Sequence, residues 1–434
     1  MGGFRDIQKQ GGDKIGLLGL FVLAVIAAYM TVALKSAVKL SEPIPLPHTG
    51  LSISMPVGNG WHSEQRWMFY ESTFIVSSIF ALQPEKATGW AHCQYKWAAK
   101  QADPEDRFAW KASDVDGEIV ETGQTQANGL TVDWVRIERA DFLLTTFWGT
   151  AKLPNDRQLD IEVHQVFSDP ELSKRIFNRI LENLSFEGDP WIEAGANVVT
   201  AVKNKGLDRQ LDDRGRRTLY LIKDPTGQPH GFTVDFLMKS GREAPLNVKG
   251  AGFLYIDGPK GGEQEVSFEC SNSLDEFKYR SRVKGAEEAY TTQVVLDPSG
   301  SLTVRKRGPQ SETKNYYPGP AALPDVFLEH ILGWMLDNDQ REIVVDIIEA
   351  GGKIVPTYIS RSETENSEAA YVFDLEFHDD QDLSQQVFLD EQKRIYKSLI
   401  QREIIYVFER TTAEEIVREF PDRAPRVLRD SQKL

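Results

Sequence analysis

The segment Pro324-Asp-Val-Phe-Leu-Glu-His-Ile-Leu-Gly-Trp-Met-Leu336 predicts a helix that is apolar almost all round. Proline and aspartate are favoured at a helix start, and only Glu329 and His330 occupy a polar arc. Such a helix has to be enclosed, because little of its surface can face water. Strand-like sequence lies on both sides of it, so we expect a long antiparallel sheet that curls around this helix.

Two turns of the same composition predict long hairpins in this region. Asp224-Pro-Thr-Gly227 and Asp297-Pro-Ser-Gly300 each combine an aspartate that accepts a local backbone bond, a proline that fixes φ and a glycine for the left-handed position. Alternating apolar residues precede and follow each turn, as in β-strands. A short helix is predicted after Thr412, because Glu415 completes a capping box.

Residues 50–188 predict a sheet and one closing helix. We expect strands at Leu51–Met55, Phe74–Leu82, Ala91–Trp97, Leu130–Arg139, Phe142–Ala151 and Leu159–Phe167. After Leu130 the apolar phase slips by one residue, which is typical of a β-bulge. Asp169 as N-cap, Pro170 at the first helical position and an apolar stripe up to Leu184 predict a helix that covers one face of the sheet.

A continuous apolar run, Ile15–Leu34, lies near the N-terminus. As a helix it would be about 30 Å long, the thickness of the hydrocarbon core of a bilayer. We interpret it as a retained signal-anchor. A cleaved signal peptide is the alternative, although the apolar part of a signal peptide is usually shorter. The residues expected in the membrane are Ile15, Leu18, Phe21, Leu23, Val25, Ile26, Val32 and Leu34.

Flanking charges and prolines complete the predicted organisation. Basic residues before the run favour a cytoplasmic tail at 1–14 and a periplasmic body, although Lys35 and Lys39 follow the run. Three alternating prolines predict an extended spacer at 35–49. A boundary at Gly188-Asp-Pro190 separates domains 50–188 and 191–434. The predicted fold class is α+β: a single transmembrane helix, an α/β sandwich, and a curved sheet around one helix.

Composition narrows the classes of partner. Charged residues make up 26% of the chain and hydrophobic residues 41%, as in globular proteins, and the formal net charge is -15. Binding to nucleic acid needs a concentrated cationic face, so no nucleic-acid partner is expected. Cys93 and Cys270 alternate with apolar residues, so we interpret each as a buried hydrophobic residue rather than half of a disulfide or a metal ligand.

Catalytic and cofactor motifs are missing from the sequence. The seven histidines are scattered, and neither the zinc-binding nor the phosphate-loop nor the serine-nucleophile pattern occurs. Gly250-Ala-Gly252 lacks the third glycine of a dinucleotide fingerprint, and we interpret it as a strand start or a bulge. We therefore predict no cofactor and no enzymatic activity.

One group of polar residues is a candidate metal site. Asp374, Glu376 and His378 alternate on a predicted strand, so their side chains share one face, and two carboxylates with an imidazole can bind a divalent cation. The neighbouring Asp379, Asp380 and Asp382 extend the acidic stretch. The opposite face is apolar, however, and a half-buried strand with a solvated polar face is the favoured interpretation of the pattern. Metal-assisted hydrolysis at this site is the least favoured function.

The segment Leu-Ser-Ile-Ser-Met-Pro with a following Gly-Trp, at 51–61, precedes a sheet and a helix that ends in Ile-Leu-Glu-Asn-Leu-Ser-Phe, at 180–186. Residues 50–188 in this respect resemble the PsbP/DcrB-like domains, which implies an α/β sandwich with a binding role. The order of elements in the second domain resembles the half-barrel of LolA/LolB-type lipoprotein carriers. That likeness implies an apolar ligand beside the enclosed helix, at Phe327, Ile331, Trp334 and Met335.

The leading functional prediction is a single-pass, membrane-anchored envelope protein with a non-catalytic binding or assembly role. Its partners would be the lipid bilayer, through the N-terminal helix, and a protein that the sequence does not identify. The alternative is a carrier or sensor of an apolar ligand, such as a lipid, in the second domain. The two hypotheses differ in whether the second domain encloses a cavity.

Overall fold

The computed structural model describes residues 39–430, apart from 47, 59, 63–67, 71–72, 84–85, 98–102, 154–156, 167–169, 207–215, 240–245, 247, 259–260, 286–288, 310, 363–368, 379–382 and 402–403. The predicted tail at 1–14 and the predicted anchor at 15–34 lie outside these residues. Within the described ranges, no helix is long and apolar enough to cross a membrane. The predicted single-pass transmembrane architecture thus has no counterpart in the described structure.

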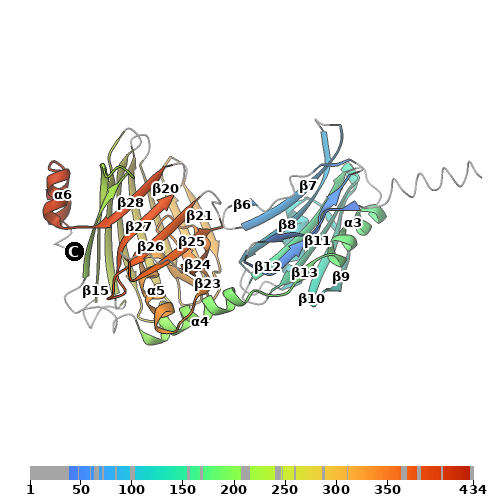
Figure 1. Ribbon diagram of the computed structural model, residues 1–434. Coiled ribbons are helices and arrows are strands. Elements are labelled where there is room, and N and C mark those ends of the chain that lie inside the picture. Colours follow the sequence, from blue (N-terminus) through green and yellow to red (C-terminus); the bar gives the residue numbers. More distant parts are fainter. Residues whose placement is uncertain are drawn as a thin grey trace, which may run out of the picture.

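The described chain is predominantly β-sheet, so the predicted α+β class is wrong. Two large sheets, one of eight strands and one of fifteen, hold most of the described residues, and the helices between them are short. Figure 1 shows the two sheets at opposite ends of helix α4, Pro190–Lys205. The class was misjudged because the sequence pattern indicates single strands but not that fifteen of them join into one ladder.

The first sheet has the order β5-β7-β8-β12-β11-β10-β9, with β6 paired to β7. Its strands are β5 Trp61–His62, β6 Met68–Tyr70, β7 Thr73–Gln83, β8 Lys86–Trp97, β9 Glu118–Ala127, β10 Leu130–Arg139, β11 Leu144–Lys152 and β12 Arg157–Val166. The register between β9 and β10 shifts at Arg136/Ile137, which confirms the predicted bulge.

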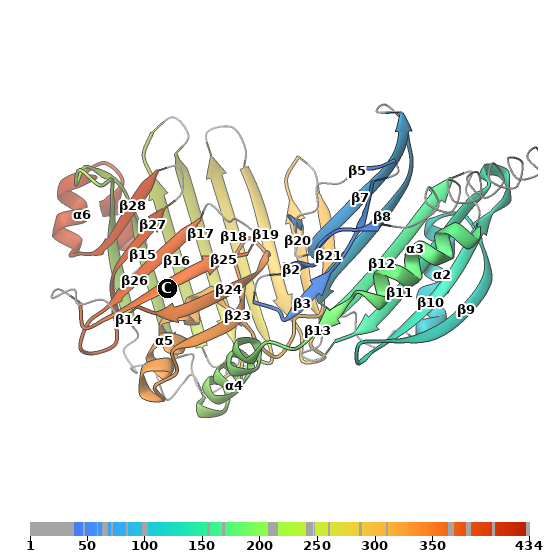
Figure 2. The same cartoon turned by 45° about the vertical axis from the view of Figure 1, so that its right-hand side comes forward.

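Two helices cover opposite faces of the first sheet. Helix α3, Pro170–Glu182, lies along β11 and β12 (Figure 2) and buries Phe177 against Phe147, which confirms the predicted closing helix. Its predicted N-cap, Asp169, lies outside the described residues. Helix α2, Pro104–Asp114, was not predicted, and it packs Phe108 against Trp148 on the other face.

The predicted spacer is part of this first unit. Strand β1, Lys39–Leu40, pairs with β4, Pro56–Val57. Strand β2, Ile44–Leu46, pairs with β3, Leu51–Ile53. On its other side, β3 pairs with β13, Ser185–Phe186. Leu46 is buried in the core, whereas Pro45 is exposed at a sheet edge, where a missing N–H costs nothing. Residues 39–46 are therefore extended, as predicted, but they do not form a free linker.

The second sheet has the order β21-β20-β19-β18-β17-β16-β15-β14-β28-β27-β26-β25-β24-β23-β22. Its strands are β14 Arg216–Lys223, β15 Pro229–Lys239, β16 Val248–Ile256, β17 Gly262–Cys270, β18 Phe277–Gly285, β19 Ala289–Leu296, β20 Leu302–Arg307, β21 Glu312–Tyr316, β22 Ala322–Pro324, β23 Glu342–Ile348, β24 Ile354–Arg361, β25 Tyr371–Phe377, β26 Ser384–Leu389, β27 Ile395–Gln401 and β28 Ile405–Arg410. All neighbouring pairs are antiparallel except β22 with β23.

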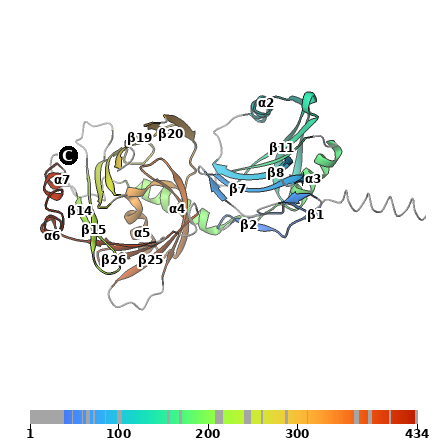
Figure 3. The ribbon, with the colours of Figure 1, turned by 90° about the horizontal axis from the view of Figure 1, so that it is seen from above.

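The second sheet wraps around helix α5, Leu328–Asp337, as Figure 3 shows from above. A 3-10 turn, Asp325–Phe327, leads into the helix. Both predicted Asp-Pro-x-Gly hairpins are confirmed: in each turn the aspartate accepts backbone N–H bonds and the glycine has a positive φ. Cys93 and Cys270 are buried in different cores, as predicted.

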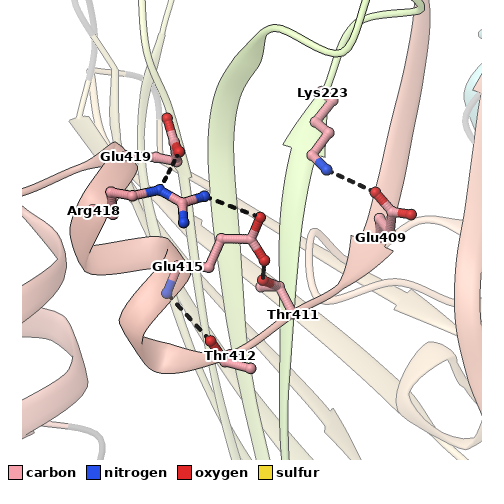
Figure 4. Close-up of polar contacts among 7 residues, drawn as sticks. All are labelled: Lys223, Glu409, Thr411, Thr412, Glu415, Arg418 and Glu419. Carbon is pink, nitrogen blue, oxygen red and sulfur yellow. Dashed lines mark hydrogen bonds and ion pairs between the residues drawn. The ribbon is translucent and has the colours of Figure 1, made fainter.

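Two C-terminal helices cover the outer face of β14–β16. Thr412 accepts the Glu415 N–H and caps α6, Ala413–Glu419, which confirms the predicted helix start (Figure 4). With α7, Ala424–Asp430, it packs onto the fully buried Phe232 and onto Val234. We name this layer, made of α6, α7 and the outward side chains of β14–β16, the outer cover.

Candidate functional site

A cavity of about 1070 Å³ lies inside the curl of the second sheet. Its walls are the inner faces of β14–β17 and β26–β28, and α5 forms its remaining side. The other half of the curl is filled by the apolar core around α5, where Phe268 meets Phe327 in an edge-to-face contact. The second domain is therefore partly solid and partly hollow.

Strand β16 leaves space for the cavity because it carries glycine on its inner face. Gly250 pairs with Leu237 and Phe268, and Gly252 pairs with Asp235 and Val266, without any shift of register. The glycines lie near the start of β16, as one of the two interpretations predicted, whereas the alternative of a bulge is wrong, since the register does not shift. A Cβ at Gly252 would stand 3.0 Å from Oδ1 of Asp235. The missing side chain thus leaves that carboxylate room.

Helix α5 has a core face and a cavity face. Phe327, Ile331 and Met335, spaced by four residues, are fully buried in the core. Trp334 alone of the four predicted ligand residues lines the cavity, together with His330 and other residues of the same helical face. The sequence identified an enclosed helix, but its strongest apolar stripe faces the packed side.

An ion pair joins α5 to the cavity wall. Both guanidinium N–H₂ groups of Arg216, on β14, donate to the Glu329 carboxylate, one of them at 2.7 Å. The same carboxylate accepts the Ile395 N–H of β27 at 2.9 Å. The sequence pattern predicted only that Glu329 lies on a polar side of the helix. In the structure, its hydrogen bonds connect the helix to β14 and β27. Burial lowers the pKa of the adjacent His330.

Two further carboxylates face the cavity. Asp325 accepts hydrogen bonds from the Tyr279 hydroxyl and from the backbone N–H groups of Val326 and Ala350, and burial raises its pKa. Asp235 lines the cavity, and its side chain is exposed there. Removal from bulk water and the nearby charge of Asp325 raise the pKa of Asp235 to about 7.

The predicted metal residues do not gather around one point. Asp374 accepts hydrogen bonds from Ser362 and Gln386, Glu376 is exposed, and His378 packs edge-on to Phe74 of the first sheet. Among the described residues no group of three or more His, Cys, Asp or Glu is arranged to hold a metal ion. Asp379, Asp380 and Asp382 lie outside those residues.

His378 instead belongs to the contact between the two sheets. His48, from the first unit, stacks on Tyr358 of β24 with ring centroids 3.9 Å apart, and His378 lies 5.5 Å away. Beside them Arg157 of β12 forms a buried ion pair with Asp346 of β23. Burial, together with the charges of His48 and Arg157, lowers the pKa of His378 to about 3.

The spacing Asp374-x-Glu-x-His378 recurs at Asp160-x-Glu-x-His164, which the sequence analysis did not single out. On β12 these side chains have separate partners: Glu162 pairs with Lys111 of α2 at 2.8 Å, His164 bonds Thr146 of β11 at 2.8 Å, and Asp160 pairs with Lys96 of β8. Burial lowers the pKa of His164 to about 4. The pairing holds α2 on the sheet, so this polar face is a structural contact.

No known family model and no curated protein matches this sequence. Among solved structures, a beta-barrel-like protein of a domain of unknown function, DUF1849, from Brucella abortus is 11% identical, with a TM-score of 0.35 over 46% of this chain and 96% of that chain. A Bacteroides thetaiotaomicron protein is 9% identical, with a TM-score of 0.23 over 38% of this chain and 61% of that chain. Neither likeness is strong enough to carry a conclusion, and the resemblances to PsbP/DcrB and LolA/LolB proteins stay predictions.

Proposed function

We propose that this protein is a carrier or sensor that holds a small amphipathic molecule in the cavity of its second sheet. The cavity itself is the observation that supports this function. Its volume of about 1070 Å³ is just above the usual range of small-molecule sites, about 300–1,000 Å³, so a small molecule has room in it.

The lining supports an amphipathic ligand rather than a purely apolar one. Leu237, Val266 and Trp334 offer apolar contact, whereas Asp235 and the Arg216–Glu329 pair offer charge. A few fixed polar groups within an apolar wall are typical of sites that bind and orient one molecule. The predicted protein partner stays a prediction, since no observation on the described residues tests it.

Filling the cavity tests this function. Gly252 has an ordinary φ, so Gly252→Leu adds a side chain to the inner wall without backbone strain. Gly351→Leu is the matched control: its Cβ would meet no atom within 4 Å, and it is not among the residues that line the cavity. Binding of the neutral apolar dye Nile red is followed by fluorescence, and co-purified molecules by native mass spectrometry.

We expect the natural protein and Gly351→Leu to bind the dye, and Gly252→Leu to lose at least about tenfold in affinity, roughly 1.4 kcal/mol. Circular dichroism should show that all three proteins keep the same β-sheet content. Equal dye binding by Gly252→Leu and the natural protein, with no co-purified molecule in either, would refute the proposed function.

A further inference from the structure

Asp235 differs from the other carboxylates of the cavity in its partners. Within the described part of the chain, its carboxylate has one side-chain contact, with the Thr233 hydroxyl at 3.5 Å, and it forms no ion pair. Glu329 is held by Arg216, and Asp337 by Lys393. Asp325 accepts one hydroxyl and two backbone donors. Asp235 therefore keeps most of its capacity to accept hydrogen bonds.

The position of Asp235 is fixed by the ladder. It stands on the inner face of β15, opposite Thr218 of β14 on one side and Gly252 of β16 on the other. Across Gly252, the next strand presents Val266 at the same level. The carboxylate thus lies opposite a bare glycine, beside Val266, on the cavity side of the strand.

Charge near Asp235 is negative. The Asp325 charge is close enough to contribute to the raised pKa of Asp235, so the two carboxylates share one electrostatic environment. No ion pair joins Asp235 to the six cationic side chains of the described lining. Arg216, Lys393 and Arg410 form ion pairs with Glu329, Asp337 and Asp390, Arg217 donates to the Leu428 carbonyl, and Lys205 and Arg394 are exposed. An anionic or neutral group beside Asp235 would be repelled or gain little, whereas a cation would satisfy it.

We propose that the ligand carries an ammonium group that pairs with the Asp235 carboxylate, while its apolar part lies against Leu237, Val266 and Trp334. This inference rests on the proposed ligand-binding function and names the chemical class of the ligand: an alkyl or ring amine, protonated at neutral pH. The N–H groups of the ammonium donate to Asp235, and an ion pair shielded by apolar walls is stronger than one in water.

Three probes that share one alkyl chain and differ in the head group test the inference. They are decylamine, 1-decanol and decanoate, each below its micellar concentration. Isothermal titration calorimetry of the full-length protein at pH 8 gives their affinities. We expect decylamine to bind at least about tenfold more tightly than decanol, and decanoate to bind most weakly. The variant Asp235→Asn keeps the shape of the side chain and removes its charge, so decylamine should fall to the level of decanol.

Asp257→Asn is the matched control, because Asp257 accepts a hydrogen bond from Tyr255 outside the cavity. It should keep the preference for the amine. Equal affinities for all three probes, or an amine preference that survives in Asp235→Asn, would overturn the ammonium inference and leave the proposed binding function standing. If none of the three probes binds and Nile red does not bind either, both proposals fail.

Discussion

Gly252 lies directly opposite Asp235 in the β15–β16 ladder, at a point where a Cβ would stand only 3.0 Å from the Asp235 carboxylate. The pair explains how a charged side chain is accommodated inside a curled sheet. The glycine leaves the space into which the carboxylate and its surroundings extend.

The pH dependence of stability should change in Asp235→Asn. The folded protein raises the pKa of Asp235 from 3.8 to about 7, so its contribution to stability is full below pH 3.8 and is lost as pH rises to 7. Solvent in the cavity screens the charge, so we expect a loss of only about 1 kcal/mol between pH 5 and 8. Urea unfolding at both pH values should show this loss in the natural protein and not in the variant. A parallel decline in both would contradict it.

Breaking the contact of α5 with the wall should destabilise the second domain. Glu329→Gln removes the charge that Arg216 and the Ile395 N–H face, and we expect a loss of about 1–3 kcal/mol in the free energy of unfolding. Asp337→Asn, which affects the more exposed pair with Lys393, should cost less than about 1 kcal/mol. Urea unfolding compares the two, and equal losses would argue against a special role of Glu329.

Removing one partner of the Arg157–Asp346 ion pair should lower the free energy of unfolding more than removing both partners. Arg157 is 5% exposed and Asp346 1%, so Arg157→Met leaves a carboxylate buried with its main cation missing, at a cost of about 3–5 kcal/mol. The double variant Arg157→Met/Asp346→Leu should regain much of this. Calorimetric unfolding gives the values, and a single variant that loses under about 1 kcal/mol would show that the pair is dispensable.

Acid should loosen the contact between the sheets through His378. Its pKa is lowered from 6.5 to about 3, so the neutral ring contributes stability that is present above pH 6.5 and is lost as pH falls toward 3. His378→Phe should remove about 2 kcal/mol of the loss seen between pH 7 and 4.5. His62→Phe, at an exposed position, is the control and should titrate like the natural protein. Identical acid curves for all three proteins would refute the prediction.

The outer cover should stabilise the cavity wall. Phe420 packs against Phe232 and Tyr255, with ring centroids 5.4 and 5.7 Å apart, and we expect Phe420→Ala to cost about 2–4 kcal/mol. Ile405→Ala, at an exposed site, should change stability by less than about 0.5 kcal/mol. Nile red binding should weaken in Phe420→Ala near its melting temperature. Unchanged stability would show that the helices are not required by the sheet.

Local chemistry made several elements predictable. The Asp-Pro-x-Gly turns, the Thr412 cap and the stripe of α3 each depend on residues a few positions apart, and the structure confirms them. Helix α4 carries equally local signals, with Asp189 capping it and Gly206 following at φ 75, but the sequence analysis did not use them. Pairings such as β14 with β28 cannot be predicted in this way, because their residues are far apart in sequence.

The polar lining of the cavity could not be predicted, because alternation does not tell which side of a strand is inside. On β15 the apolar side chains Phe232 and Val234 point outward under α6 and α7, and Thr233 and Asp235 point into the curl. The usual assignment, apolar inward and polar outward, is thus reversed. For α5, likewise, the sequence pattern does not tell which face meets the cavity. The most apolar face, with Ile331, packs in the core, and Trp334 lines the cavity.

The outer cover separates two requirements that most proteins meet with the same residues. The stability of the wall depends on aromatic packing outside the curl, around Phe232. The inner surface at Gly250 and Gly252 therefore does not have to provide that stability. Substitutions on the inner face of the sheet can therefore change which molecule fits the cavity while the fold is kept. Substitutions in the outer cover instead change the stability of the fold. In a protein built this way, the ligand specificity of the cavity can change during evolution with little effect on folding.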